Sequence, residues 1–391
     1  MRKVGIGLGL AGWFFWLVLL NGSLPAAEPA VQMNQSLVIL REAMELSRDR
    51  GLHPPDEARA TARAVRAYLS TLEDPYSTYL SREELQALEN MDRPDYAGVG
   101  LEVIQAARKG IFCVPFDAGP AHIAGIQSGD RLLAVNGESV AEASLEMLPP
   151  LVRGQAGTTV VLTVAGPDGR EREAKVIRAQ VSRPVVESNF DGDMSKIRIY
   201  RFTRETPDLV AQGLQLDPDR GKVIIDLRGN IGGELEAAVS TAALFLPPGR
   251  LVASVVGRPG SARPPARHLV SLEGGKYSSR KIVIWQDQMT ASASELFIAA
   301  LTHHGVAVTI GRRTFGKGLV QGQFPASGGG LYIITTGELL TPDGISFNNQ
   351  GLPPRLLIRN SARDGDYFIR TAEAFTVYSE IMADRKNPFD I

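Results

Sequence analysis

The 391-residue sequence contains a single cysteine, Cys113, and only five histidines. One cysteine forms neither an intramolecular disulfide nor a zinc site built from several thiolates, and scattered histidines leave few ligands for a metal centre. We therefore expect a protein that works without a metal or any other cofactor.

The sequence also lacks an excess of either charge, because 42 Lys and Arg face 43 Asp and Glu, for a net charge of −1. Without a basic surplus there is no bulk field to attract nucleic acid or anionic lipid, so a nucleic-acid partner is not expected. Apolar residues make up 44% of the chain, enough at this length for roughly two to three domains with buried cores.

Long hydrophobic runs are absent except at the start, where residues 4–20 carry no charge and follow Arg2 and Lys3. Small residues, Ala26 and Ala27, then offer a cleavage point, which completes the layout of an export signal. An uncleaved membrane anchor is the alternative, since the run has the minimum length of a span. We expect an exported protein of the bacterial periplasm or cell envelope, with membrane contact confined to residues 1–27.

Changes in sequence texture divide the rest of the chain. Residues 28–95 show apolar residues at helical spacing, and residues 96–183 show short β-like runs separated by turn residues, as in a small β-rich domain. Residues 184–360 alternate strand and helix patterns, and residues 361–391 read as a helical tail. The stretch 257–281, rich in proline and glycine, is predicted to be a long loop or lid.

The alternating region predicts an α/β core, because strands separated by helices pair in parallel through crossover connections. The predicted strands are 223–227, 252–256, 282–285 and 306–310, and the predicted helices are 235–245 and 294–303.

Ser292 lies in the segment Thr-Ala-Ser-Ala-Ser-Glu, where a predicted strand feeds the start of a helix. Free N–H groups and the positive end of the helix dipole meet its hydroxyl there, which suits a nucleophile. A simple helix N-cap is the more common role of a serine at such a place, so Ser292 alone does not identify a catalytic site.

Lys317 stands between two glycines in Thr-Phe-Gly-Lys-Gly-Leu-Val-Gln, so other parts of the core can pack closely over it. Burial lowers the pKa of a lysine, and a neutral amine can take a proton from a serine hydroxyl. Gln321, four residues on, falls on the same face of an extended chain and can orient the amine. A surface lysine stays open as an alternative, whereas the order Gly-Lys-Gly does not fit a phosphate loop.

Two glycines, Gly232 and Gly233, follow another predicted strand and precede a helix. Their backbone N–H groups have no shielding side chain and suit an oxyanion, although a tight turn needs glycine too. In the β-rich region, Gly98-Val99-Gly100-Leu101 opens a strand whose amides, those of Val99 to Leu101, can hold a peptide carboxylate while the strand edge pairs with the peptide. An ordinary glycine-rich strand entry is the alternative.

Together these motifs resemble the carboxy-terminal processing proteases, tail-specific serine peptidases with an internal PDZ domain. The similarity runs from the turn at Leu72-Glu73-Asp74-Pro75-Tyr76-Ser77 to about Pro354, in the family's order. It implies a crotonase- or ClpP-like α/β core, a PDZ domain inserted at 96–183, and a helical N-terminal region packed on the core.

By this resemblance Ser292 is the nucleophile, Lys317 the general base and Gln321 its orienting partner. The resemblance likewise implies that Ala293 N–H and the Gly232-Gly233 turn form the oxyanion hole. Arg153, in the segment Leu-Val-Arg-Gly-Gln, resembles the PDZ arginine that couples peptide docking to the protease core. The segment 286–290 departs from the family's usual Asn-led sequence, which affects the shape of the substrate pocket.

The sequence thus predicts an exported serine endopeptidase that cuts proteins near free C-termini. A proteolytically inactive PDZ scaffold is the alternative, disfavoured because tail binding needs none of Ser292, Lys317 and Gln321. An acyl-CoA hydratase-like enzyme is a more remote third reading. The expected partners are protein or peptide substrates, while an adaptor or a homo-oligomer stays open.

Overall fold

The computed structural model describes residues 35–72, 74–90, 96–106, 110–141, 143–191, 193–216, 221–258, 266–272, 274–358 and 364–384. The predicted export signal or anchor at 1–27 lies outside these residues. Within them, no helix has the length and apolar character needed to cross a membrane.

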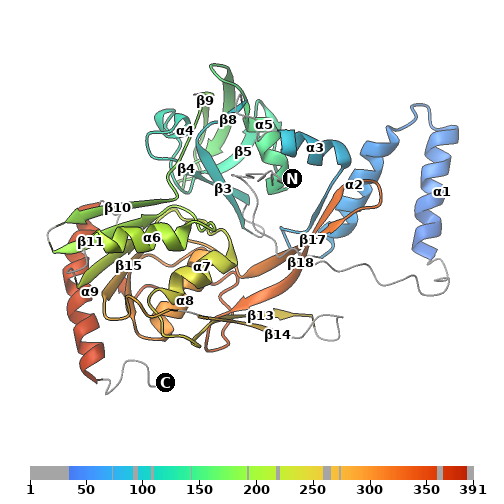
Figure 1. Ribbon diagram of the computed structural model, residues 1–391. Coiled ribbons are helices and arrows are strands. Elements are labelled where there is room, and N and C mark those ends of the chain that lie inside the picture. The colour runs from blue at the N-terminus through green and yellow to red at the C-terminus, as the bar shows by residue number, and fades with distance from the viewer. Residues whose placement is uncertain are drawn as a thin grey trace, which may run out of the picture.

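The N-terminal region joins the core through a strand. Its elements are α1 (Gln35–Arg50), α2 (Glu57–Ser70), β1 (Thr78–Leu80) and α3 (Arg82–Asn90). Ser81 and Glu84 form a reciprocal capping box before α3, with N–H to side-chain oxygen distances of 2.8 and 3.3 Å. In contrast to the expected packing of the whole region, α1 projects beside α2 and remains largely exposed (Figure 1).

The second region is an antiparallel sheet with the strand order β3-β4-β5-β8-β9, closed by short helices. Its interior is filled by Ile111, Cys113, Leu162 and other apolar side chains. The elements are β2 (Tyr96–Ala97), β3 (Leu101–Ala106), β4 (Gly110–Pro115), α4 (Pro120–Ile123), β5 (Arg131–Val135), β6 (Glu138–Ser139), the 3₁₀ helix η1 (Leu145–Met147), α5 (Leu148–Val152), β7 (Gly154–Gln155), β8 (Thr159–Ala165) and β9 (Glu171–Ile177).

A six-stranded sheet of order β10-β11-β12-β15-β16-β19 forms the centre of the third region, and all its pairs except β10–β11 are parallel. This confirms the parallel pairing expected for the strands near 223–227, 282–285 and 306–310. The strands are β10 (Val186–Asp191), β11 (Met194–Ile199), β12 (Lys222–Asp226), β15 (Lys281–Gln286), β16 (Ala307–Gly311) and β19 (Leu356–Leu357), and the helices are α6 (Thr206–Gln215), α7 (Leu235–Ala243), α8 (Ala293–His303) and α9 (Asp364–Asp384).

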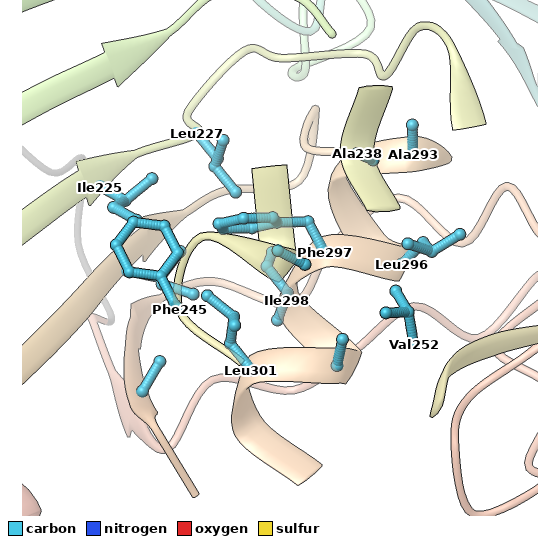
Figure 2. Close-up of a cluster of buried hydrophobic side chains, with 14 of the residues drawn as sticks. Ile225, Leu227, Ala238, Phe245, Val252, Ala293, Leu296, Phe297, Ile298 and Leu301 are labelled. Carbon is cyan, nitrogen blue, oxygen red and sulfur yellow. The ribbon is translucent and has the colours of Figure 1, made fainter. Parts of the chain in front are cut away.

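The two faces of this sheet are covered by different helices because strand side chains alternate. Ile225 and Ile284 face α7 and α8 and pack with Phe245 and Phe297, the cluster drawn in Figure 2. Trp285 and the other side chains on the opposite face of the sheet pack against α9 instead. This helix lies on the far side of the sheet from α6 and α7 (Figure 1). The C-terminal helix is thus part of the packed core.

The predicted strand at 252–256 belongs to a second, antiparallel sheet, so its expected place in the parallel sheet is wrong. Residues 281–286 (β15) occupy the position beside β12, so the strand at 252–256 has no place next to β12 in the parallel sheet. This second sheet has the order β1-β18-β13-β14, with β17 also paired to β18. Its strands in the core are β13 (Leu251–Gly257), β14 (Ala266–Val270), β17 (Leu319–Pro325) and β18 (Leu331–Leu340).

The stretch 257–281 is also not the featureless loop that was predicted, because it contains β14. The sequence Ala-Arg-His-Leu-Val has little strand character of its own, and its pairing with β13 supplies the missing hydrogen bonds. In the second sheet, the long strand β18 pairs with β13 near its end and with the N-terminal strand β1 near its start (Figure 1).

Candidate active site

Loops that follow three neighbouring parallel strands meet at the carboxyl edge of the sheet, where α/β proteins commonly place their sites. The loop after β12 carries Gly232 and Gly233, the loop after β15 leads to Ser292, and the loop after β16 carries Lys317. The order β12-β15-β16 makes these loops neighbours in space although they are distant in sequence.

Ser292 occupies the N-cap position of α8 with backbone angles φ 57° and ψ −118°. An ordinary N-cap has extended backbone, and a non-glycine residue at positive φ costs about 1–3 kcal/mol unless its surroundings hold it there. Ser292 and Glu295 form a capping box, so the serine does cap α8, but its backbone angles are those of a sharp turn that an ordinary cap does not need. The serine is 7% exposed, so a reactant must enter a largely enclosed site to reach it.

Gly232 approaches this turn so closely that only glycine fits. A Cβ built on Gly232, whose φ is +108°, would lie 2.8 Å from the Ser292 Cβ and 3.1 Å from the Ala293 nitrogen. The two glycines of this loop are thus required by close approach as well as by turn geometry.

The amide of Gly232 is not available as an oxyanion donor, contrary to the sequence-based prediction. Its N–H donates to Asn230 Oδ1 at 2.9 Å. Gly233, by contrast, lies opposite Phe202 in a parallel β-bridge. The groups that bond to Phe202 are the carbonyl of the residue before Gly233 and the N–H of the residue after it, so the N–H of Gly233 itself points to the opposite side. Ala293 is the first residue of α8, where amides lack an intrahelical partner. Gly233 and Ala293 are therefore the two candidate donors.

Asn230, which the sequence analysis did not single out, holds the two loops together. Its side-chain Nδ2 donates to Ile199 O at 2.9 Å. Its backbone carbonyl accepts the Ala291 N–H at 3.0 Å and the Ser294 hydroxyl at 3.1 Å. Being fully buried, it fixes the glycine turn against the residues on either side of Ser292.

Lys317 is buried, with 2% of its surface exposed, so the surface-lysine alternative is wrong. A Cβ on Gly316 would lie 2.7 Å from Gly351 N, and one on Gly318 would lie 2.9 Å from Asn348 Cβ. The close packing expected from Gly-Lys-Gly is therefore present. Burial lowers the pKa of Lys317 to about 7, and the nearby Glu146 carboxylate opposes this shift.

Glu295 connects the serine turn to the lysine loop, a role that the sequence did not reveal. Its carboxylate accepts the Ser292 N–H at 2.8 Å, the Gly316 N–H at 2.8 Å, the Lys317 N–H at 2.9 Å and the Thr314 hydroxyl at 2.5 Å. Burial raises the pKa of Glu295 to about 7 against these hydrogen bonds. Only its place three residues after Ser292 hinted at a capping role.

Asp287 ties together the same two loops a little further from the serine. It accepts the Gly229 N–H at 3.1 Å, the Met289 N–H at 3.0 Å and the Thr290 hydroxyl at 3.1 Å. The segment 286–290, which departs from the pattern of the resembled family, is thus held internally by its own aspartate.

Gln321 shares a cavity of about 70 Å³ with Lys317. A β-bulge between Val320 and Gln321 interrupts the simple alternation of side chains that the sequence predicts. The side chains of Lys317 and Gln321 nevertheless both line this cavity. Gln321 Nε2 lies 3.3 Å from Thr335 Oγ1. The remaining lining is mostly apolar: Tyr76, Leu80, Leu88, Glu102, Val103, Leu145, Glu146, Pro149, Arg201, Ile231, Gln323, Leu331 and Ile333.

The expected carboxylate loop lies at the start of β3. Gly98 N–H pairs with Ala179 O at 3.0 Å, so its amide is already used. Gly100 has φ +63°, and its carbonyl accepts the Phe116 N–H at 2.8 Å. The alternation of an antiparallel ladder then turns the Leu101 N–H away from β4, toward the open edge of β3.

The β-rich domain is seated on the core by charged and aromatic contacts. Glu102 pairs with Arg183 at 2.9 Å, and both side chains are at most 10% exposed. The Arg183 guanidinium lies 4.8 Å from the Phe116 ring centroid and 4.4 Å from that of Tyr200. Arg153 follows α5 directly as its C-cap, and its N–H donates to Pro149 O at 2.9 Å.

Among the described residues, no group of three or more His, Cys, Asp or Glu side chains is placed to hold a metal ion. Cys113 is buried within the β-rich domain, where burial raises the pKa of its thiol to about 12.

Comparisons with known proteins place the chain among peptidases that carry a PDZ domain. Residues 193–358 match peptidase family S41, and residues 117–166 match the PDZ domain. The chain is 29% identical over 316 residues to a probable CtpA-like serine protease of Staphylococcus haemolyticus, covering 80% of this chain and 63% of that protein. It is 26% identical over 339 residues to the carboxy-terminal processing protease CtpA of Bacillus subtilis, covering 86% and 72%.

The fold also resembles that of a solved photosystem II D1 C-terminal processing protease. The TM-score is 0.71 at 26% identity, covering 83% of this chain and 87% of the other. The chain spans less than two thirds of the staphylococcal relative's length.

Proposed function

The chain belongs to peptidase family S41, among the carboxy-terminal processing proteases, and on that premise we propose that it is a serine endopeptidase acting through a dyad of Ser292 and Lys317. The observation that carries this proposal is a buried lysine, its pKa lowered to about 7, whose loop is joined to the serine turn by Glu295. Such an amine is neutral often enough near neutral pH to act as a base.

The mechanism follows from these positions. Ser292 Oγ attacks the scissile carbonyl carbon as its proton passes to the neutral Lys317 amine, and the carbonyl π electrons become an oxyanion. The Gly233 and Ala293 N–H groups stabilise that negative charge. When the C–N bond breaks, the Lys317 ammonium returns the proton to the leaving amine. Water then hydrolyses the acyl-serine with Lys317 again as the base.

Gln321 is proposed to orient the Lys317 amine, because both side chains line the same cavity. The apolar lining of that cavity suits an uncharged substrate side chain, and it excludes water that would otherwise solvate the lysine.

The PDZ domain is proposed to select substrates by their free C-termini. The Val99 to Leu101 amides would hold the terminal carboxylate while the open edge of β3 pairs with the tail. The basic start and uncharged run of residues 1–27 support export to the bacterial periplasm or cell envelope, with the segment cleaved or kept as an anchor.

The proposal is tested by incubating an unfolded protein with wild type, Ser292→Ala and Lys317→Ala and following the products by mass spectrometry. We expect both variants to lose cleavage and to keep the wild-type melting temperature within a few degrees. Their losses should not add in the double variant, since nucleophile and base act as one unit. Normal turnover by Lys317→Ala would reject the dyad.

A proteolytically inactive tail-binding protein is the competing function. It predicts that wild type binds free-acid peptides without cleaving them, and that Ser292→Ala binds and behaves identically. The combination of a strained serine turn and a buried lysine favours the peptidase, because peptide binding by β3 requires neither.

A further inference from the structure

Tyr76 lies directly against the proposed base. Lys317 Nζ is 4.6 Å from the centroid of the Tyr76 ring. At this separation the face of an aromatic ring attracts an ammonium and not a neutral amine, so the contact favours the protonated lysine.

The hydroxyl of the same tyrosine reaches the PDZ domain. Tyr76 OH donates to the Gln105 carbonyl at 3.0 Å, and burial raises the pKa of the phenol, which keeps the donor protonated. Gln105 has the same parity on β3 as Leu101, so its backbone groups face the open edge of the strand. Tyr76 therefore occupies the edge that a substrate tail would use.

The segment that carries Tyr76 is fixed at its base. Asp74 accepts the Tyr76 N–H at 2.9 Å and the Thr335 hydroxyl at 2.9 Å, which anchors the turn to β18. Thr335 Oγ1 also lies 3.3 Å from Gln321 Nε2. With the backbone held, only the side chain of Tyr76 can move if its hydroxyl loses the Gln105 carbonyl.

The lysine, the tyrosine and the PDZ domain share one space. The cavity that contains Lys317 is lined by Tyr76, by Val103 of β3 and by Glu146 of η1. Val103, two residues before Gln105 on β3, thus borders the same cavity as Lys317 and Tyr76.

We propose that Tyr76 is a positioning residue for Lys317. A substrate tail that pairs with β3 donates a backbone N–H to the Gln105 carbonyl and displaces the Tyr76 hydroxyl from it, and the tyrosine ring then moves away from the lysine. This inference rests on the proposed function. The released lysine loses a contact that favours its ammonium form, and it becomes the neutral base at lower pH. Tail docking and base activation are then one event.

Other charges also face Lys317 and set the background for this effect. Glu102 and Glu146 from the PDZ domain and Arg201 from the core line the same cavity, while Glu295 binds the lysine's own amide. These groups are unchanged by substitutions at Tyr76, so a difference between Tyr76 variants reports the ring and its hydroxyl.

Tail length gives a test in the wild-type protein. With the terminal residue near Leu101, an antiparallel tail reaches Gln105 with about its fifth residue. The rate of cleavage of an amidated reporter peptide is measured against pH with added uncleaved free-acid peptides of three or six residues. We expect the six-residue peptide to raise kcat and lower the pH midpoint by about half a unit or more, and the three-residue peptide to bind without either effect.

Variants separate the hydroxyl from the ring. Tyr76→Phe should raise the rate without added tail and cut activation by the six-residue peptide several-fold. Tyr76→Leu should have a lowered pH midpoint with or without tail. Tyr79→Phe is the matched control, since Tyr79 packs on Tyr332 with ring centroids 5.0 Å apart and should leave both readouts as in wild type.

The outcomes distinguish this inference from the function on which it rests. Cleavage that persists in Ser292→Ala rejects the proposed function. Cleavage that requires Ser292, with equal activation by three- and six-residue peptides or with unchanged activation in Tyr76→Phe, rejects only the role of Tyr76. A merely structural Tyr76 would lower the rate of its variants without moving the pH midpoint.

Discussion

Ser292 and Lys317 donate their backbone N–H groups to the same atom, Glu295 Oε2, at 2.8 and 2.9 Å. The other oxygen, Oε1, accepts the Gly316 N–H and the Thr314 hydroxyl. A single buried carboxylate therefore sets the position of the proposed base relative to the proposed nucleophile, and it also holds the strained serine backbone in place.

We expect Glu295→Gln to lower both stability and activity. An amide offers one acceptor oxygen where the carboxylate uses two, and its NH₂ group would face donors. The unfolding free energy should fall by about 1.5–3 kcal/mol and peptide cleavage by at least about ten-fold. Chemical denaturation and kcat measure the two effects. The control is Glu236→Gln in the first turn of α7, whose half-exposed side chain pairs with Arg267; similar losses there would contradict a specific role for Glu295.

Cleavage should rise with pH through a midpoint near 7, because burial lowers the pKa of Lys317 to about 7 and only the neutral amine accepts a proton. The same shift affects stability. Since the pKa of Lys317 in the folded protein lies below its ordinary value of 10.5, the unfolded state binds more protons between the two values, so the unfolding free energy should rise as pH increases from about 7 to 10.5. Lys317→Met should abolish this rise, and an unchanged pH dependence would assign it to another group.

Gly232→Ala should abolish cleavage while leaving tail binding by the PDZ domain intact. The added methyl would lie 2.8 Å from Ser292 Cβ and 2.9 Å from Ala291 O, at φ +108°. We expect kcat to fall at least about a hundred-fold, since displacement of the serine turn also moves the Ala293 donor. Gly328→Ala, where a methyl meets nothing within 4 Å, should retain wild-type kinetics. Equal activity of both variants would place the reacting atoms elsewhere.

Amidation of a peptide's C-terminus should weaken its binding to Ser292→Ala protein by about ten-fold or more, as measured by calorimetry. A terminal carboxylate gains charge-assisted hydrogen bonds from the β3 entry that an amide does not replace, each worth roughly 1.5–3 kcal/mol. If free-acid and amidated peptides bind equally, the PDZ domain does not read the terminus.

Arg153→Ala should lower the cleavage of tailed substrates while peptide binding persists, because coupling and binding are separate free energies. Arg153 lies at the C-cap of α5 and is not among the residues that line the cavity of Lys317. Titration of Ser292→Ala and Ser292→Ala/Arg153→Ala proteins with the same peptide provides the control. An Arg153→Ala enzyme with full activity would exclude a coupling role.

The sequence pattern predicted several local features that the structure shows. Hydrophobic runs located the strands of the parallel sheet, and glycines on either side of Lys317 correctly predicted that its side chain is buried. It failed where pairing partners decide the outcome. The sequence predicts the strand at 252–256, but it predicts a loop for the antiparallel partner β14, whose own strand propensity is weak.

The chemical groups of the proposed site and their local settings can be read from the amino-acid order: a serine at a helix start, a lysine between glycines, and paired glycines after a buried strand. Which backbone groups remain available as donors depends on packing between distant segments. Gly232 and Gly233 look alike in sequence, yet Asn230 engages one amide and leaves the other. Glu295 and Tyr76 acquire their roles through contacts with residues far away in sequence, at Lys317 and Gln105, because such contacts depend on how the sheets and domains pack and not on any local pattern.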